Sequence, residues 1–188
     1  MSGNQIPSTY RVTISRCTRD LPVRRMPSGT HVAIFNILGD TALTEVAGTN
    51  LAQRILGGVS APDFLLVPDG KSLALAHVIS RESGLPLIVA RKGIKSYMLD
   101  PVVDISPATM TTGGRQTFAI DGADVERLRH HRVMLIDDVI STGATQDVLE
   151  RLISAAGGTV AGIAVVFTEG DKRPGVISLG HLPVWPAT

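Results

Sequence analysis

The chain has 188 residues, of which 44% are hydrophobic and 19% charged, and its 18 basic residues nearly balance 17 acidic ones. This length and composition exclude intrinsic disorder and favour one globular domain over residues 1–188. The formal net charge of +1 argues against binding to nucleic acid in bulk. No apolar run approaches the roughly 18 residues of a membrane span, and the single cysteine, Cys17, excludes a disulfide framework. We therefore expect a soluble, cytoplasmic protein without membrane contacts.

Basic residues are concentrated near the N-terminus. The cluster comprises Arg11, Arg16, Arg19, Arg24 and Arg25, with Asp20 as the acidic residue among them. Such a cluster is usually a solvated or subunit-facing surface, which is the interpretation we favour. An arm that contacts RNA or DNA is the alternative.

Residues 10–38 have the pattern of short strands. Tyr10–Ile14 alternates polar and apolar residues, and Val32–Leu38 forms a second candidate strand after the proline- and glycine-bearing stretch Pro22–Gly29. Together they predict a small β-rich subdomain. Asp40 then has the position of a helix N-cap, and the helix is expected to continue to about Leu56, before a pair of glycines.

From residue 64 onward, strands alternate with helices. Such alternation predicts a parallel sheet with helices on both faces. The predicted strands are Phe64–Val67, Leu87–Ala90, Gln116–Ile120, Val133–Ile136 and Thr159–Phe167, and the predicted helices are Leu73–Glu82, Val125–Arg129 and one that ends at Gly157–Gly158. The tail through Trp185 is expected to pack on the β-rich subdomain or on a second subunit.

Residues 92–115 show little periodicity, although compact domains rarely contain so long a structureless loop. The segment begins within a basic run that contains Arg91, Lys92 and Lys95. Because this run follows the carboxyl end of a strand, we interpret the segment as a lid that closes over an anion. A solvated basic turn is the alternative.

The most informative segment is residues 133–145. Four apolar residues predict a strand buried on both faces, and Asp137 and Asp138 follow at its carboxyl end, where open α/β sheets bind ligands. The turn Ser141–Thr145 offers backbone N–H groups, hydroxyls and a glycine that can adopt a left-handed conformation at the start of a helix. The acids can accept hydrogen bonds from sugar hydroxyls, and the turn can bind phosphate. The segment thus predicts a site for a phosphorylated sugar.

A second anion site is predicted at residues 69–72. Lys71 supplies positive charge, and a helix begins near Ser72 with its N–H groups directed outward. A nucleoside-triphosphate P-loop is excluded because Leu65 stands where that motif requires glycine. A helix start with a solvated lysine is the alternative, but the nearby acid pair on a neighbouring strand end favours the anion site.

Residues 133–145 resemble the 13-residue phosphoribosyl-pyrophosphate motif of type I phosphoribosyltransferases: four hydrophobic residues, an acidic pair, two more hydrophobic residues and a Thr-Gly-x-Thr turn fall in register. Asp69–Ser72 falls where that family has its pyrophosphate loop, and Gly84–Lys92 looks most like the adenine and xanthine enzymes. The resemblance implies an α/β fold whose Rossmann-like parallel sheet is flanked by helices, over about residues 40–168. It also implies a flexible loop over about 92–115 and a small β-rich hood from about residues 1–38 plus the C-terminal tail.

The resemblance further implies an activity, the transfer of 5-phosphoribosyl from phosphoribosyl pyrophosphate to a purine base with release of pyrophosphate, as in purine salvage. The implied cofactor is Mg²⁺, held by phosphate oxygens and water with few protein ligands, and a homodimer is the family's usual form. The implied catalytic residues are Asp137, Asp138 and Lys71; the implied 5′-phosphate site is Ser141, Thr142, Gly143, Ala144 and Thr145; the implied pyrophosphate site is Asp69, Gly70, Lys71, Ser72, Arg91, Lys92 and Lys95.

Base recognition is less readable from the sequence. Phe35, Phe167 and Thr168 are the candidates that the resemblance suggests. Adenine enzymes of the family carry an acidic residue in the flexible loop, whereas here only Asp100 and Asp104, earlier in the loop, are substitutes. Adenine is favoured, with xanthine or hypoxanthine as alternatives. A regulatory protein that senses phosphoribosyl pyrophosphate without turnover is the other alternative.

Overall fold

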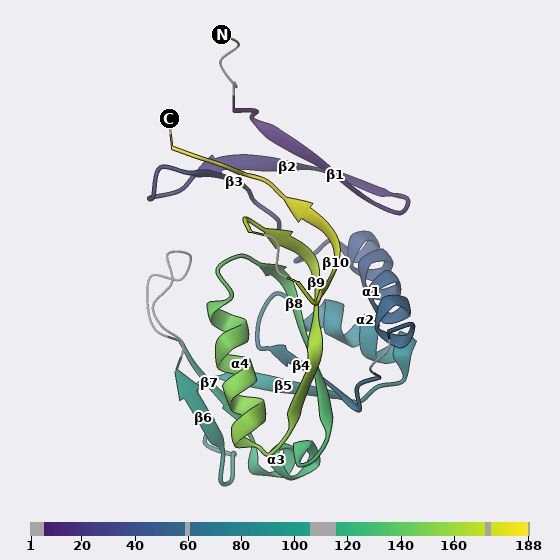
Figure 1. Ribbon diagram of the computed structural model, residues 1–188, viewed down its shortest axis with the longest axis vertical. Coiled ribbons are helices and arrows are strands. Elements are labelled where there is room, and N and C mark those ends of the chain that lie inside the picture. The colour runs from purple at the N-terminus through teal and green to yellow at the C-terminus, as the bar shows by residue number, and fades with distance from the viewer. Residues whose placement is uncertain (1–5, 59–60, 106–115, 172–173, 188) are drawn as a thin grey trace.

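The computed structural model describes residues 6–58, 61–105, 116–171 and 174–187. In these ranges the strands form two sheets, with the smaller one, the hood, at the end of the molecule where both termini lie (Figure 1). The hood sheet is antiparallel with the order β1-β2-β3-β11. Its strands are β1 (Thr9–Ile14), β2 (Cys17–Arg25), β3 (His31–Ala33) and β11 (Val184–Trp185).

The hood differs from its prediction at β2 and β3. The stretch Pro22–Gly29 was expected to be a connection, but its first part, up to Arg25, belongs to β2. The second predicted strand, Val32–Leu38, is replaced by the shorter strand His31–Ala33. Pro22 is tolerated because the pairing of β2 with β3 ends one residue later, at Val23 and Ala33. The Pro22 carbonyl still accepts from Ile34 N at 2.9 Å, and the N–H that proline lacks is not needed for this pairing.

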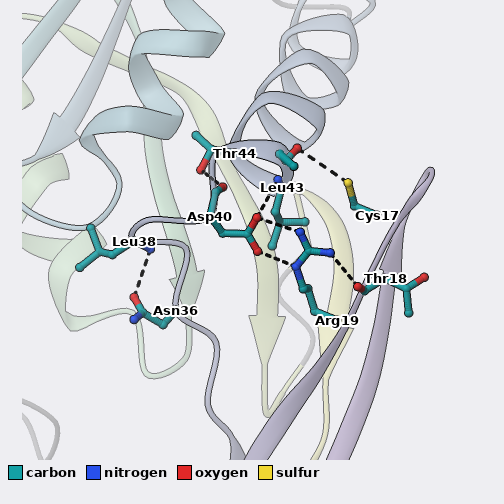
Figure 2. Close-up of polar contacts among 9 residues, drawn as sticks. Cys17, Thr18, Arg19, Asn36, Leu38, Asp40, Leu43 and Thr44 are labelled. Carbon is teal, nitrogen blue, oxygen red and sulfur yellow. Dashed lines mark hydrogen bonds and ion pairs between the residues drawn. The ribbon is translucent and has the colours of Figure 1, made fainter.

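One carboxylate joins the hood to the core. Asp40 is the N-cap of α1 (Thr41–Leu56), as predicted, and its side chain accepts from Leu43 N at 3.1 Å. Arg19 of β2 donates to both oxygens of the same carboxylate, at 2.6 and 2.8 Å (Figure 2). These hydrogen bonds hold the pKa of Asp40 below its usual value. The start of α1 and an ion pair between hood and core therefore use the same side chain, beside the apolar cluster that the hood and α1 share.

The core sheet has the order β10-β9-β8-β4-β5-β7-β6. Strands β10, β9, β8, β4 and β5 are parallel, which confirms the predicted sheet. The bounds are β4 (Phe64–Pro68), β5 (Leu87–Lys92), β6 (Val102–Ile105), β7 (Thr117–Ile120), β8 (Arg132–Ile140), β9 (Thr159–Glu169) and β10 (Val176–Leu182).

Helices cover both faces of this sheet (Figure 1). Along β8, Met134 and Ile136 pack into the apolar cluster of α1 and α2 (Leu73–Ser83), whereas Val133 and Leu135 pack into that of α3 (Gly122–Leu128) and α4 (Ala144–Ala155). Alternate residues of one strand thus serve two cores, which explains the continuous apolar run in the sequence. Of the helices in the described ranges, none has the length and apolar character needed to cross a bilayer.

Two segments contain strands that were not predicted. Within the segment expected to lack periodicity, Val102–Ile105 forms β6, which pairs antiparallel with β7; β7 in turn is antiparallel to β5. The rest of that predicted lid, residues 106–115, lies outside the described ranges. The tail was expected on the hood, but only β11 is there, since β10 extends the core sheet beside β9. Short strands with mixed polarity gave too weak a pattern to be recognised.

Candidate functional site

A cavity of about 1020 Å³ lies between the hood and the carboxyl ends of the parallel strands. Its core wall is formed by the β4–α2 loop, the end of β8 and the β8–α4 turn, and its hood wall by residues around β3 and by Val184 of β11. The cavity therefore lies at the strand ends where the sequence predicted a ligand site.

The acid pair lies at the floor of the core wall. Because β8 continues to Ile140, Asp137 and Asp138 are inside the last half of the strand. Asp137 Oδ1 accepts hydrogen bonds from Ser72 Oγ at 2.6 Å and from Asp138 N at 2.9 Å, and its Oδ2 accepts from Gln146 Nε2 at 2.8 Å. Burial, and secondarily the charge of Asp138, raise the pKa of Asp137 to about 7. The carboxyl group of Asp137 is thus enclosed and fixed from three directions.

The β8–α4 turn has the features of a phosphate site. All five predicted residues, 141–145, line the cavity. Gly143 is the N-cap of α4 with φ 84°, the left-handed conformation that the sequence predicted, and has no side chain to cap the helix, although Thr142 Oγ1 accepts from Ala144 N at 3.5 Å. The first-turn N–H groups, at the positive end of the helix dipole, can therefore bind an anion beside the hydroxyls of Ser141 and Thr142.

The β4–α2 loop provides a second polar surface of the same wall. Gly70 has φ 154°, and the position of a β-carbon on it lies 3.4 Å from Lys92 Nζ, so the lysine ammonium rests against the loop backbone. Lys71 and Lys92 both line the cavity and are exposed. The loop therefore combines cations with a helix start that no side chain caps.

The predicted pyrophosphate residues do not all meet at the cavity. Asp69, Gly70, Lys71, Ser72 and Lys92 line it, whereas Arg91 and Lys95 do not. Arg91 Nε lies 3.1 Å from Asp69 Oδ2 in an ion pair without hydrogen-bond alignment. Lys95 Nζ donates to the carbonyl of Lys92 at 2.8 Å. Contact of Arg91 or Lys95 with a ligand thus requires a side-chain rearrangement.

The base candidates are similarly divided. Phe35 lines the cavity and packs edge-on against Phe167, with 4.8 Å between ring centroids. Phe167 and Thr168 are buried and do not line the cavity, and Thr168 Oγ1 lies at hydrogen-bond distance, 2.9 Å, from His181 Nδ1. Beyond them, Glu169 at the end of β9 lines the cavity, and burial raises the pKa of its carboxyl group.

Among the cavity residues that were not predicted as site residues are two polar ones, Gln146 and Glu169. Gln146 has a recognisable signal: it shares the inner face of α4 with Leu149 and Ile153, and a polar residue in such an apolar stripe indicates a buried partner. Glu169 has a weaker signal, an acidic residue at the carboxyl end of a buried strand. Both follow segments that the sequence had already marked as functional.

The structure is that of an α/β protein with a cavity at the carboxyl ends of a parallel sheet, beneath a separate hood. The family model described as "Phosphoribosyl transferase domain" matches residues 36–177, about three quarters of the chain. The chain belongs to this family. Both the predicted family and the predicted enzyme class, a phosphoribosyltransferase, are confirmed.

Individual relatives agree with this assignment. The chain is 29% identical over 175 residues to an adenine phosphoribosyltransferase of Corynebacterium diphtheriae, covering 93% of this chain and 90% of the relative. It is 32% identical over 109 residues to a hypoxanthine/guanine phosphoribosyltransferase of Methanohalophilus mahii, covering 58% and 53%, so about half of that relative is matched. The crystal structure of adenine phosphoribosyltransferase from Leishmania donovani superposes with a TM-score of 0.63 at 19% identity, over 93% of this chain and 76% of that one, and supports the fold.

Proposed function

We propose that the protein transfers the 5-phosphoribosyl group of phosphoribosyl pyrophosphate to a purine base, with adenine favoured, and releases pyrophosphate. The observation that carries the proposal is the core wall, where an acid pair lies between two helix starts whose N-cap residues make no side-chain cap hydrogen bond. A sugar with a phosphate group at each end matches that arrangement. The adenine enzyme of C. diphtheriae is matched over nearly its whole length, which supports adenine over hypoxanthine or guanine.

Each end of the donor has a proposed receptor. The 5′-phosphate binds at the β8–α4 turn, where N–H groups and hydroxyls of residues 141–145 can donate hydrogen bonds. The pyrophosphate binds at the β4–α2 loop beside Lys71 and Lys92. Asp137 and Asp138 accept hydrogen bonds from the ribose hydroxyls between the two.

In the reaction, the bond from the anomeric carbon to pyrophosphate oxygen breaks, a purine nitrogen bonds to that carbon, and the N–H proton of the base passes to the departing pyrophosphate, directly or through water. The departing pyrophosphate gains negative charge while the ribose ring becomes cationic. Lys71 and Lys92 stabilise the first change, and the carboxylate of Asp138, which lines the cavity, stabilises the second.

Mg²⁺ is the proposed cofactor. In the described ranges no group of three or more His, Cys, Asp or Glu side chains is arranged to hold a metal ion. A Mg²⁺ that would take its ligands mainly from pyrophosphate oxygens and water, as this ion prefers, does not require such a group. The protein's part is then to hold the pyrophosphate beside Lys71, and the ion would supply additional positive charge.

The base is proposed to bind against the hood wall. Ile34 and Phe35 supply apolar surface there, and Glu169 faces the same cavity from the end of β9. An apolar slot of this kind suits a flat heterocycle, and a carboxyl group can pair with an amino or ring N–H group of a purine. Phe167 and Thr168 then support the base site without lining it. Phe167 packs on Phe35, and Thr168 fixes the end of β9 through its hydrogen bond with His181.

The deciding experiment is pyrophosphate release from phosphoribosyl pyrophosphate and Mg²⁺ with adenine, hypoxanthine, guanine, xanthine and orotate supplied separately. Turnover with adenine above the other bases supports the proposal in full, and turnover with another purine corrects the base alone. Tight binding of phosphoribosyl pyrophosphate without turnover of any base would instead support a regulatory protein that senses this compound.

We also propose a homodimer. The β5–β6 connection carries three apolar side chains, Ile94, Tyr97 and Leu99, that are 60%, 64% and 75% exposed, and a second copy would remove them from water. Sedimentation velocity at micromolar concentration should give about twice the mass of 19.9 kDa. A single species of monomer mass would refute the dimer.

A further inference from the structure

Four polar side chains are buried in the described parts of the chain, and two of them contact the same carboxylate. Ser72 is 2% exposed and Gln146 is 3% exposed. They donate to opposite oxygens of Asp137, at 2.6 and 2.8 Å. Because a buried polar group is costly unless it is paired, these contacts fix all three side chains relative to one another.

Both donors stand at helix starts but do not cap their helices. Ser72 is the N-cap residue of α2, a position from which serine ordinarily accepts from a first-turn N–H, yet it makes no side-chain cap hydrogen bond. Gln146 is the third residue of α4, from which a glutamine can turn back to the N-cap, but its amide is directed to Asp137. Each side chain is thus used between helices, and neither occupies the first-turn N–H groups, of which Leu73 N donates to the carbonyl of Gly70 at 3.3 Å and Ala144 N to Thr142 Oγ1 at 3.5 Å.

The three residues therefore connect the two helix starts. Ser72 belongs to the β4–α2 loop and Gln146 to the first turn of α4, 74 positions apart in the chain, with Asp137 of β8 between them. A shift of either helix start relative to the other would stretch at least one of two short hydrogen bonds to a charged or partly charged carboxyl group. Such bonds are stronger than neutral ones.

We propose that Ser72 and Gln146 are positioning residues that, through Asp137, hold the two phosphate subsites at the spacing of one doubly phosphorylated sugar, so that filling one subsite favours filling the other. This inference rests on the proposed function. An anion bound at one helix start restrains the other start through Asp137, so the second anion pays less of the ordering cost, and that saving appears as positive coupling between the two ends. Without the connection, each subsite still has its own N–H groups and cations, but the spacing between them varies.

The experiment measures coupling directly. Isothermal titration gives the affinity for ribose 5-phosphate with and without saturating magnesium pyrophosphate, and the ratio of the two is the coupling factor. We expect a factor of about 10 or more in the wild-type protein. In Ser72→Ala and in Gln146→Leu the coupling factor should fall below about 3. The affinity for each ligand alone should change by a smaller ratio than the coupling factor does.

Three further variants separate positioning from general loss of structure. Ser72→Thr keeps the hydroxyl and should restore the coupling. Gln146→Glu directs a carboxylate at Asp137 and should lower the coupling at least as far as Gln146→Leu does. Thr44→Ala is the matched control, because Thr44 is also a buried hydroxyl, bonded to the carbonyl of Asp40 at 2.8 Å in α1, away from the cavity; its coupling should equal that of the wild type.

The outcomes distinguish this inference from the proposed function. A wild-type protein that binds neither ligand defeats the proposed function itself. Coupling that persists in both Ser72→Ala and Gln146→Leu, or a wild type that turns over the donor without any coupling, overturns the positioning role alone. If Ser72→Ala does not fold, as judged by its thermal transition, Gln146→Leu and the Ser72→Thr rescue decide the matter by the same ratio.

Discussion

The two walls of the cavity differ in chemistry. The core wall has Asp137, Asp138, Lys71 and Lys92 together with two helix starts, whereas the hood wall presents Val32, Ala33, Ile34, Phe35 and Val184. Charge is concentrated on the core wall, whereas the hood wall is mainly apolar, with hydroxyls at Ser28 and Thr30. This difference supports the proposal that the core recognises the phosphorylated sugar and the hood recognises the base.

The largest effect is expected from the acid pair of the core wall. Asp137→Asn with Asp138→Asn removes both charges beside the cationic ribose, and kcat/KM should fall by on the order of 1,000-fold. Pyrophosphate release measures this, and a near-UV circular dichroism spectrum like that of the wild type would show that the fold is kept. Near-normal turnover would remove the acids from the proposed site.

Lys71→Ala tests the pyrophosphate end of the same wall. Loss of a charged hydrogen-bond donor should weaken magnesium pyrophosphate binding by about 10- to 100-fold and change ribose 5-phosphate binding by no more than about twofold. Calorimetric titration with each ligand gives the comparison. Arg129→Ala is the control, because Arg129 is a half-exposed cation that does not line the cavity. Equal losses for both ligands in Lys71→Ala would contradict the assignment.

The enclosed carboxyl group of Asp137 makes stability depend on pH. Its pKa is about 7 in the folded protein against an ordinary 3.8. Between those values the unfolded chain releases the proton while the folded protein retains it, so stability falls as pH rises through this window. Relative to Asp137→Asn, the wild type should lose up to about 1.4 kcal/mol of unfolding free energy per pH unit. Urea denaturation at several pH values checks this, and parallel curves for the two proteins would contradict the raised pKa.

The smallest effect is expected on the hood wall. Ile34→Ala removes apolar surface beside the proposed base and should raise KM for the base about threefold while leaving KM for the donor unchanged. Val160→Ala is a matched control, since Val160 is 36% exposed against 37% for Ile34 and does not line the cavity. A larger change in the KM of the donor than of the base would mean that the two walls are not independent.

Features set by neighbours in sequence were predictable. Asp40 caps its helix, Gly143 adopts a left-handed conformation, and Asp137 comes directly after the buried apolar run of β8, because each depends on a few adjacent residues. Features set by distant partners were not. Ser72 was assigned to the pyrophosphate site, but its hydroxyl donates to a carboxylate 65 positions away, and Arg91 of β5 pairs with Asp69 of the β4–α2 loop.

The hood wall was hardest to anticipate because it is assembled from both ends of the chain. Val184 pairs with Val32 across 152 positions, and neither strand has a strong pattern alone. The core wall, by contrast, consists of two contiguous loops, and a contiguous motif can be read from sequence.

The chain crosses between core and hood twice, between Ala33 and Thr41 and again at Pro183, and the Arg19–Asp40 pair reinforces the first crossing. Beside these crossings, β1 and β2 pack on α1 within one apolar cluster that includes Leu43, Ala47 and Leu51, so the hood and the core share a single interior. Loss of the hood would therefore expose part of the core as well as remove one wall of the cavity. We expect the two sheets to unfold in one cooperative transition.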